Sequence, residues 1–354
     1  MMKDNKTIAI VIPSLQGNGA ERVMLNLATS LQQNGHNVHI IIFKEVIELK
    51  YDKNINVHFF KKHYRWIPRG IRGFALSSIL DKFIIQHCGN PDLVLSNLLP
   101  VDRILSYSRL NVYMVIQNTM SKEITGLGRS LPVMAKIYTR KPTVCCSKGV
   151  MKDLISLFSE YKLKKTCYIY SPIDAIFIKN MGCSLPPFPF KNYIIHVGKF
   201  GDQKRHDILI KAYHKSGVNE KLVLLTKGSC AIKQKLKTLV KSLKIEDKVI
   251  FAGFKSNPYP YVKHAKLMVL SSAYEGLPTV ILESLVLGTP VISTDCESGP
   301  REILPQKNLT PVGDTDALAN QIRGAMKNID NFKTDIDEVF LLESTTNKYL
   351  ELAE

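Results

Sequence analysis

The sequence predicts an α/β protein made of two doubly wound parallel-sheet domains. Short apolar runs such as Thr7–Pro13 and Val38–Phe43 alternate with longer amphipathic stretches such as Glu21–Asn34. Runs of that length, bounded by turn residues, are typical of buried strands, and their alternation with helices indicates a parallel sheet. The alternation starts again at Tyr193–Gly198, and a chain of 354 residues suits two domains better than one.

The first domain continues with two more buried strands and a capped helix. Asp92–Ser96 and Val112–Ile116 have the apolar composition of strands inside a sheet. Asn118 follows the second of these strands, at the carboxyl end, where open parallel sheets bind ligands. Ser147 precedes Gly149–Leu157 and is expected to cap that helix, because its hydroxyl can accept a hydrogen bond from a free first-turn N–H.

In the second domain a strand, a loop, a helix and another strand surround two glutamates. Leu267–Leu270 predicts a buried strand, and the helix is expected to begin near Pro278, where a missing N–H costs nothing. Gly288 is expected to end that helix. Glu275 lies in the loop and Glu283 lies in the helix, eight positions later. A carboxylate in such an apolar helix is costly unless it meets donors, although a partly exposed helix residue is the plain alternative.

The charge of the chain is strongly positive and uneven. The net charge is +17, and residues 1–170 hold 24 Lys and Arg against 11 Asp and Glu, whereas the rest holds 24 against 20. Such a field fits an anionic membrane or a nucleic acid. Val57–Arg72 interleaves cations with Trp66 and Ile67, which suits a membrane headgroup region as well as it suits a solvated loop. Later basic clusters have few aromatic residues, so they lack the stacking platform of a single-strand binder.

The cysteines and the apolar stretches limit the class of protein further. Seven cysteines are an odd number, and they are scattered without a C-x-x-C pair. This pattern favours reduced thiols over a disulfide framework or a zinc site. The longest uncharged apolar stretches are shorter than the about 20 residues that cross a bilayer, so we expect a cytoplasmic protein.

The loop and helix around the two glutamates resemble a known family. SSAYEGLPTVILE, followed in order by GTPVIST and GPREI, is similar to the E-x7-E region of the family 4 glycosyltransferases. The resemblance spans nearly the whole chain and implies the GT-B architecture, two Rossmann-like domains facing a cleft. It implies that Glu283 accepts hydrogen bonds from the ribose hydroxyls of a nucleotide-sugar. It also implies that Glu275 lies beside the donor sugar and phosphates.

Other segments extend this resemblance. GNGAER is similar to the GGAE loop, whose backbone approaches the donor at Gly17 and Gly19, although a plain strand-to-helix turn stays open. KFGDQKRHDILIKAY matches a segment in which Lys199 replaces the usual arginine and Lys204 keeps the lysine. Two cations there would oppose the charge that grows on a leaving diphosphate, although a solvated cluster at a helix start is the alternative. The loop GFKSNP would face the nucleobase around Phe254.

The remaining substrate-binding candidates come from the same comparison with the family. They are Gly276, Leu277, Pro278, Thr279 and Asn118. Many family members have a histidine near Asn118, where this chain has Gln117, so an inherited general base is in doubt there.

The domain limits also follow from the family pattern. CYIYSPID at Cys167–Asp174 resembles the crossover between the domains. We expect a first domain over residues 1–170, a nucleotide-sugar domain over 171–335, and a helix over 336–354 that crosses back to the first domain. Leu185–Phe190 is expected to be an extended, proline-rich connector.

The resemblance implies a retaining glycosyltransferase. It would move a hexose or N-acetylhexosamine from a UDP-linked sugar to a saccharide or lipid-linked saccharide acceptor, in the synthesis of lipopolysaccharide, capsule or another surface glycan. The expected partners are this donor, this acceptor and an anionic membrane surface, without nucleic acid, which places the protein at the inner face of the cell membrane. No cofactor is expected, because the nucleotide-sugar is a substrate. No metal is expected either, because Asp314 of the D-x-D sequence is well placed to cap the following helix.

Other classes of protein remain to be weighed. A nucleotide-sugar epimerase or an inactive protein of the same fold would keep the donor pocket, and a basic nucleic-acid-binding protein is a remote alternative. A nicotinamide dehydrogenase is excluded mainly because Arg22 stands where its fingerprint needs a third glycine.

Overall fold

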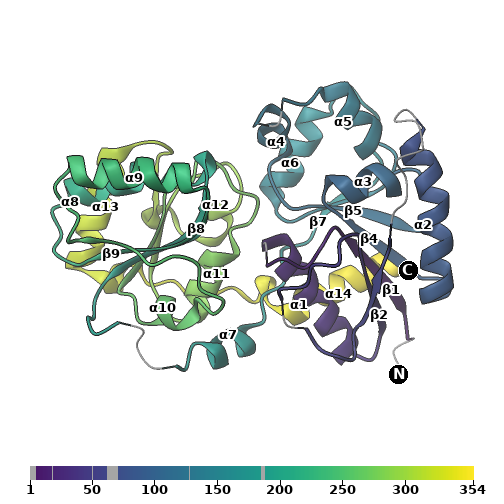
Figure 1. The fold of residues 1–354 in the computed structure, drawn as a ribbon, viewed down its shortest axis with the longest axis horizontal. Coiled ribbons are helices and arrows are strands. Elements are labelled where there is room, and N and C mark those ends of the chain that lie inside the picture. The colour runs from purple at the N-terminus through teal and green to yellow at the C-terminus, as the bar shows by residue number, and fades with distance from the viewer. Residues whose placement is uncertain (1–4, 18, 50, 62–70, 127, 185–187) are drawn as a thin grey trace. The chain divides into compact units, whose positions relative to one another are not determined.

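A computed structural model describes residues 5–17, 19–49, 51–61, 71–126, 128–184 and 188–354. The chain divides into two compact units, and Figure 1 shows each unit as a sheet surrounded by helices. The first unit comprises Met1–Ile173 with Val339–Glu354, and the second comprises Asp174–Glu338. The change from one unit to the other therefore lies after Ile173 and again after Glu338, against expected limits at residues 170 and 335.

The first unit is built on a parallel sheet of seven strands in the order β3-β2-β1-β4-β5-β6-β7. Its strands are β1 (Thr7–Ile12), β2 (Asn37–Ile42), β3 (Asn56–Phe59), β4 (Leu93–Asn97), β5 (Val112–Ile116), β6 (Thr143–Cys145) and β7 (Thr166–Tyr168). Its helices are α1 (Gly19–Gln33), α2 (Arg72–Cys88), α3 (Leu99–Leu105), α4 (Met120–Gly126), α5 (Leu131–Tyr138), α6 (Lys148–Leu157) and α14 (Leu342–Leu350).

Both faces of this sheet are covered by helices. Successive side chains of a strand point to opposite faces, so β1 contributes to two cores. Ile8 and Ile10 pack in a core with side chains of α1 and α14. Ala9 and Val11 pack on the other face with side chains of α2 and α3. The continuous apolar composition of Thr7–Pro13 is therefore explained by a strand that is buried on both faces of the sheet.

The C-terminal helix α14 belongs to the first unit, although it follows the whole second unit in the chain. Thr346 Oγ1 donates to Ser30 Oγ of α1 at 2.8 Å, and Tyr349, 2% exposed, joins the core of that unit. In Figure 1 the yellow α14 lies beside the purple α1. The expected return of the last helix to the first domain is confirmed.

The second unit is built on a parallel sheet of six strands in the order β10-β9-β8-β11-β12-β13. Its strands are β8 (Ile194–Phe200), β9 (Leu222–Gly228), β10 (Val249–Phe251), β11 (Leu267–Leu270), β12 (Val291–Thr294) and β13 (Leu309–Thr310). Its α-helices are α7 (Ala175–Met181), α8 (His206–Ser216), α9 (Cys230–Ser242), α10 (Tyr259–Lys263), α11 (Thr279–Val286), α12 (Pro300–Ile303) and α13 (Thr315–Lys327).

Two helical layers cover the second sheet as well. Leu267 and Val269 face the core formed with α8, α9 and α13, whereas Met268 and Leu270 face the core formed with α10 and α11. In both units the strand order runs outward in two directions from the first strand and its neighbour, which is the doubly wound arrangement of a Rossmann-like domain. The predicted fold class is therefore confirmed for both units.

Two helix starts predicted from capping residues are confirmed. Ser147 Oγ accepts from Val150 N at 3.1 Å at the start of α6. Asp314 accepts from the backbone N–H groups of Asp316 and Ala317 at the start of α13, so the first aspartate of the D-x-D sequence is a helix cap.

Two predicted element boundaries are corrected. Strand β8 extends to Phe200 rather than ending at Gly198, so Lys199 lies in the strand. Helix α11 begins at Thr279, and Pro278 is its N-cap residue rather than its first residue.

Two predicted segments fall partly outside the described residues. They are residues 62–70 of the basic, aromatic segment and residues 185–187 of the proline-rich connector. Among the helices that the structure describes, none combines the length and apolar composition needed to span a membrane. All seven cysteines are free thiols.

Candidate functional site

The carboxyl ends of β8 and β11 form the topological switch point of the second unit. The two strands pair in parallel, with Leu267 opposite Ile194, and from this pair the chain continues outward in opposite directions. The loops that follow two such strands diverge, which leaves a crevice where open α/β sheets bind ligands. Both loops carry residues singled out in the sequence: Lys204 follows β8, and Glu275 follows β11.

An ion pair joins these two loops. Lys204 Nζ lies 2.5 Å from Glu275 Oε1, and Ser272 Oγ donates to the same oxygen at 2.6 Å. The side chain of Lys204 is 20% exposed and that of Glu275 is 7% exposed. A carboxylate so deeply buried needs charge and hydrogen-bond donors, and here it has both. The structure thus brings together two candidate residues that are 71 positions apart in the chain.

Hydrogen bonds to the backbone hold the two loops in a single arrangement. Gln203 Nε2 donates to the Tyr274 carbonyl at 2.8 Å, and the Gln203 carbonyl accepts from Ala273 N at 2.7 Å. Ser298 Oγ donates to the Glu275 carbonyl at 2.5 Å, which ties the loop after β12 to the same site. The Lys204–Glu275 pair is therefore held by main-chain contacts as well as by its own charges.

Close packing around Pro278 explains a glycine in this site. Gly299 has a φ of +83°, and a Cβ there would lie 2.5 Å from Pro278 Cδ and 2.9 Å from the Gly276 carbonyl oxygen. A larger residue would be strained in its backbone and would push the Gly276–Pro278 loop away. Gly276, Leu277 and Pro278 are all buried.

The N-terminus of α11 lies at the end of the same loop. Pro278 has no side-chain hydrogen bond to offer as a cap, so the first-turn N–H groups around Thr279 and Val280 meet no N-cap side chain. The partial positive charge of such a terminus favours an anion. Glu283 lies inside α11 and is half-buried, a position that fits either a carboxylate at a ligand or a partly exposed helix residue.

Lys199 lies on a different face of the sheet from Lys204. A Cβ added to Gly198 would lie 3.7 Å from both Cδ and Cε of Lys204. Because neighbouring strand residues point to opposite faces, the side chain of Lys199 points toward the α10 and α11 layer, and it is exposed. The two lysines expected to act together thus approach the crevice from different sides.

Phe254 lies beyond the end of β10 and is 51% exposed. Lys227 Nζ lies 4.9 Å from the centroid of its ring. An exposed aromatic ring held by a cation near the carboxyl end of β9 can stack on a flat ligand.

Two buried histidines beneath the Lys204 turn were not among the predicted site residues. His196 Nδ1 donates to the Val269 carbonyl at 2.9 Å, which leaves Nε2 as a lone pair without a partner among the described residues. Its ring packs against His206 with centroids 4.6 Å apart. Burial, and then the neighbouring His206, holds the pKa of His196 well below its usual value. Burial, and then Lys204, lowers the pKa of His206 to about 4.

These histidines are therefore neutral at physiological pH and add no charge to the site. The sequence carried a signal for one of them, because His196 interrupts the apolar run YIIHVG, although β8 continues for four residues beyond it. A polar side chain inside an apolar strand is costly to bury, so it indicates a specific contact there.

The candidate residues of the first unit lie at the carboxyl edge of its sheet. Gly17 follows β1 with a φ of +89°, and Gly19 is the first residue of α1, with nothing within 4 Å of its Cβ position. Asn18 between them is outside the described residues. Asn118 follows β5, where its Oδ1 accepts from Thr119 N at 2.9 Å and its side chain hydrogen-bonds to Glu123. The left-handed backbone explains why the chain has glycine at position 17.

The carboxyl groups of Glu21 and Asp102 are also buried in the first unit. Glu21 is 1% exposed and accepts from Ser14 Oγ at 2.9 Å. Asp102 accepts from Ser96 Oγ at 2.6 Å and from Tyr138 OH at 2.9 Å. Burial raises the pKa of Asp102 to about 7 although both hydrogen bonds oppose the shift.

Comparison with known proteins gives a consistent result along the chain. The family model described as "Glycosyltransferase Family 4" matches residues 17–118, and the model described as "Glycosyl transferases group 1" matches residues 185–338. Among solved structures, HepE of Anabaena in complex with UDP and glucose superposes with a TM-score of 0.78 and 17% identity, over 98% of this chain and 99% of that chain. TarM of Staphylococcus aureus superposes with a TM-score of 0.78 and 12% identity, over 99% of this chain and 100% of that chain.

Curated relatives agree with the family models. A Campylobacter jejuni N-acetylgalactosaminyltransferase that acts on a diphospho-undecaprenol-linked sugar is 36% identical over 159 residues, which are 44% of this chain and 42% of that protein. The lipopolysaccharide 1,6-galactosyltransferase of Salmonella typhimurium is 32% identical over 142 residues, 38% of each chain. A second Campylobacter jejuni N-acetyl-D-galactosaminyltransferase is 22% identical over 93% of this chain and 91% of its own. The chain thus spans less than half the length of the first two of these relatives.

The fold places the chain in the class of GT-B proteins, which have two Rossmann-like domains. Together with the two family models, this shows that the chain belongs to the family 4 glycosyltransferases. The resemblance read from the sequence is confirmed at the level of family and fold.

Proposed function

We propose that the protein is a retaining glycosyltransferase of surface-glycan synthesis that uses a UDP-linked hexose or N-acetylhexosamine. The observation that carries the proposal is the buried Lys204–Glu275 pair at the switch point of the second sheet, next to the uncapped N-terminus of α11. A cation and a helix N-terminus without an N-cap side chain at one place suit a diphosphate, and a buried carboxylate beside them suits the hydroxyls of a sugar.

Each part of a nucleotide-sugar has a candidate partner in the second unit. Glu283 accepts hydrogen bonds from the ribose hydroxyls, and Phe254 stacks on the base. The diphosphate lies against the N-terminus of α11, where Lys204 compensates its charge. Glu275 then orients the sugar. Lys199 approaches the phosphates from the α11 side of the sheet.

The reaction itself is a displacement on one face of the sugar. The acceptor oxygen bonds to the anomeric carbon while the bond from that carbon to the phosphate oxygen breaks. The acceptor proton passes to a phosphate oxygen of the leaving UDP, so no protein nucleophile and no metal ion is required. Lys204 and the N–H groups of α11 stabilise the diphosphate most when its negative charge is greatest, which lowers the barrier rather than strengthening ground-state binding.

The relatives support the substrate classes. Proteins similar to this chain are named for transfer to lipopolysaccharide and to diphospho-undecaprenol-linked sugars, and HepE was solved with UDP and glucose. We extend these classes to this chain, with a saccharide or lipid-linked saccharide as acceptor and without nucleic acid as a partner. Such an acceptor is reached at the inner face of the cell membrane, where the basic first half of the chain meets anionic lipid.

The proposal is tested by the binding of nucleotide-sugars to the purified protein. A panel of UDP-, GDP- and ADP-sugars is screened by thermal shift, and Kd is then measured by calorimetry for wild type and for Glu283→Gln. An amide accepts less strongly than a carboxylate, so Kd should rise roughly tenfold. Glu246→Gln, an exposed glutamate of the same unit, is the matched control and should keep the wild-type Kd.

Two results would count against the proposal. Equal donor affinity in wild type and Glu283→Gln would remove Glu283 from the site. A donor that binds and is converted, but yields no saccharide product when its sugar is labelled, would indicate an epimerase rather than a transferase.

A further inference from the structure

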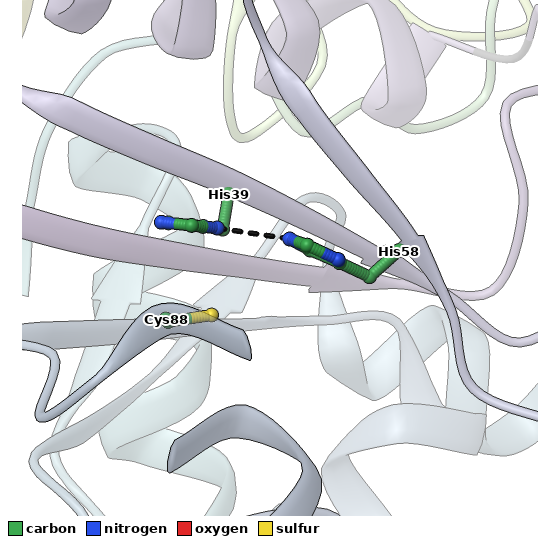
Figure 2. A group of neighbouring side chains, drawn as sticks. All are labelled: His39, His58 and Cys88. Carbon is green, nitrogen blue, oxygen red and sulfur yellow. Dashed lines mark hydrogen bonds between the residues drawn. The ribbon is translucent and has the colours of Figure 1, made fainter. Parts of the chain in front are cut away.

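Two histidines and a cysteine of the first unit meet at the edge of its sheet. They are His39 in β2, His58 in β3 and Cys88 at the end of α2. His39 Nδ1 and His58 Nε2 are 2.9 Å apart, and one ligand atom from each of the three residues lies within 4.8 Å of the others. Figure 2 shows the two imidazole rings end to end with the sulfur of Cys88 beside their junction.

The register of the sheet creates this meeting. Asn56 is opposite His39, so His58, two residues further along β3, points to the same face of the sheet as His39. Ile41, two residues after His39, packs in the core that contains the α2 side chains and Cys88. The three groups therefore converge because β2, its edge strand β3 and the last turn of α2 pack together.

The two imidazoles of this cluster are in the form that binds metal ions. Burial holds the pKa values of His39 and His58 below their usual range, and His87 on α2 adds a smaller effect in the same direction. The rings are therefore neutral, which is the form that binds metal ions. His39 is 6% exposed, and its Nε2 has no hydrogen-bonding partner among the described residues. This nitrogen points away from His58, so His39 Nδ1, which meets His58 Nε2, is the atom placed to bind an ion (Figure 2).

We propose that His39, His58 and Cys88 form a binding site for a borderline-soft divalent metal ion such as Zn²⁺. Two imidazoles and one thiolate are ligands typical of zinc, and three protein ligands leave a fourth position for water. Sequence spacing carries no sign of the site, because its ligands come from three separate elements rather than from a compact C-x-x-C or H-x-x-H pattern.

Only small movements are needed to close this site around an ion. At Zn–N distances of about 2.0–2.1 Å, two tetrahedral imidazole nitrogens lie about 3.3 Å apart, and sulfur lies about 3.6 Å from each of them. The rings must therefore separate slightly, and Cys88 must approach by about 1 Å. Among the described residues β3 pairs with β2 alone, so a shift at His58 disturbs one ladder there. The ring centroid of His87 is 4.9 Å from that of His58, so His87 is a further polar side chain next to the site.

The bound ion displaces one proton from the protein. Burial raises the pKa of the Cys88 thiol to about 12, so this thiol is protonated in the metal-free protein at neutral pH. Metal ligation forms a metal–sulfur bond and releases the thiol proton to solvent, whereas the two imidazoles are already neutral. The expected stoichiometry is one proton for each ion bound. The ion would then link β2, β3 and α2 and raise the unfolding temperature of the first unit.

The test uses Co²⁺ as a spectroscopic probe of the full-length protein freed of metal by chelation. We expect one Co²⁺ per chain, a sulfur-to-cobalt charge-transfer band, release of one proton per ion, and displacement by Zn²⁺. Cys88→Ser should lose both the band and the proton release. His58→Gln, at a half-buried position on the edge strand, should keep the fold and raise the Kd for Co²⁺ at least tenfold.

Matched variants decide whether the signal comes from this site. Cys230→Ser and His214→Gln change exposed residues of the second unit and should leave the stoichiometry, band and Kd unchanged. The proposal is wrong if Co²⁺ gives no thiolate band, if Cys88→Ser keeps the band, or if folded His58→Gln binds Co²⁺ as tightly as wild type.

Discussion

The buried ion pair between Lys204 and Glu275 makes a quantitative prediction. Lys204→Ala removes the cation 2.5 Å from a carboxylate whose side chain is only 7% exposed. Removing one partner of a buried pair typically costs about 3–5 kcal/mol, because the other charge stays in a poorly solvated place. Lys204 is itself 20% exposed, so water can enter where its side chain was. We therefore expect the lower end of that range, about 3 kcal/mol.

Thermal unfolding measures this cost. For a unit of this size each 1 kcal/mol corresponds to about 2–4 °C, so the transition of the second unit should fall by roughly 6–12 °C. Glu275→Gln combined with Lys204→Ala removes both charges and should recover much of that loss, which a double-mutant cycle reports as coupling. The control is Lys215→Ala, which breaks an exposed pair with Asp316 and should cost less than about 1 kcal/mol.

Turnover separates structural from chemical effects. Lys204→Ala should lower kcat by about 10²–10³ with little change in acceptor KM, because its charge acts mainly on the leaving diphosphate. The double variant should remain as slow even though it regains stability. If the double variant is as unstable as Lys204→Ala, the unpaired Glu275 carboxylate is not the cause of the loss. If Lys204→Ala turns over normally, Lys204 does not stabilise the leaving group.

Two further predictions concern a buried acid and an exposed ring. Asp102, which accepts from Ser96 and Tyr138, has a folded-state pKa of about 7, above its ordinary value of 3.8, so its protonated form stabilises the first unit. That stabilisation is complete below about pH 4 and is lost as the pH rises to about 7. The unfolding temperature of wild type relative to that of Asp102→Asn should therefore fall over this window. A difference between the two proteins that does not change with pH would contradict this prediction. Phe254→Ala should weaken UDP binding by about 1–3 kcal/mol, because it removes the stacking of the ring on the base. The stability of the protein should change little, because the ring is 51% exposed. An unchanged Kd for UDP would contradict the stacking role of Phe254.

Local patterns in the sequence predicted much of the fold. The apolar runs marked the strands because a parallel strand is buried on both faces and tolerates few polar residues. Ser147 and Asp314 predicted helix starts because a cap bonds only to the next few residues. The β11–loop–α11–β12 unit was predicted for the same reason, since its signals lie within one short segment.

The candidate site was predicted only in part. Glu275 and Lys204 were each identified from a motif, but their direct contact and the hydrogen bond from Ser272 to Glu275 were not. Lys199 and Lys204 were expected to act together at the mouth of a strand, but β8 includes Lys199, whose side chain points to the other face of the sheet. One extra strand residue reverses the direction of a side chain, and strand ends are poorly marked in sequence.

The sequence by itself determined the order of strands and helices, the family, and the segments that carry the donor-site candidates, because these depend on residues close together in the chain. The tertiary structure alone decided which distant side chains meet. Lys204 with Glu275, and His39 and His58 with Cys88, are brought together by strand order, register and helix packing. These contacts arise only when the sheet forms and buries the polar groups between its layers, so no local sequence pattern predicts them.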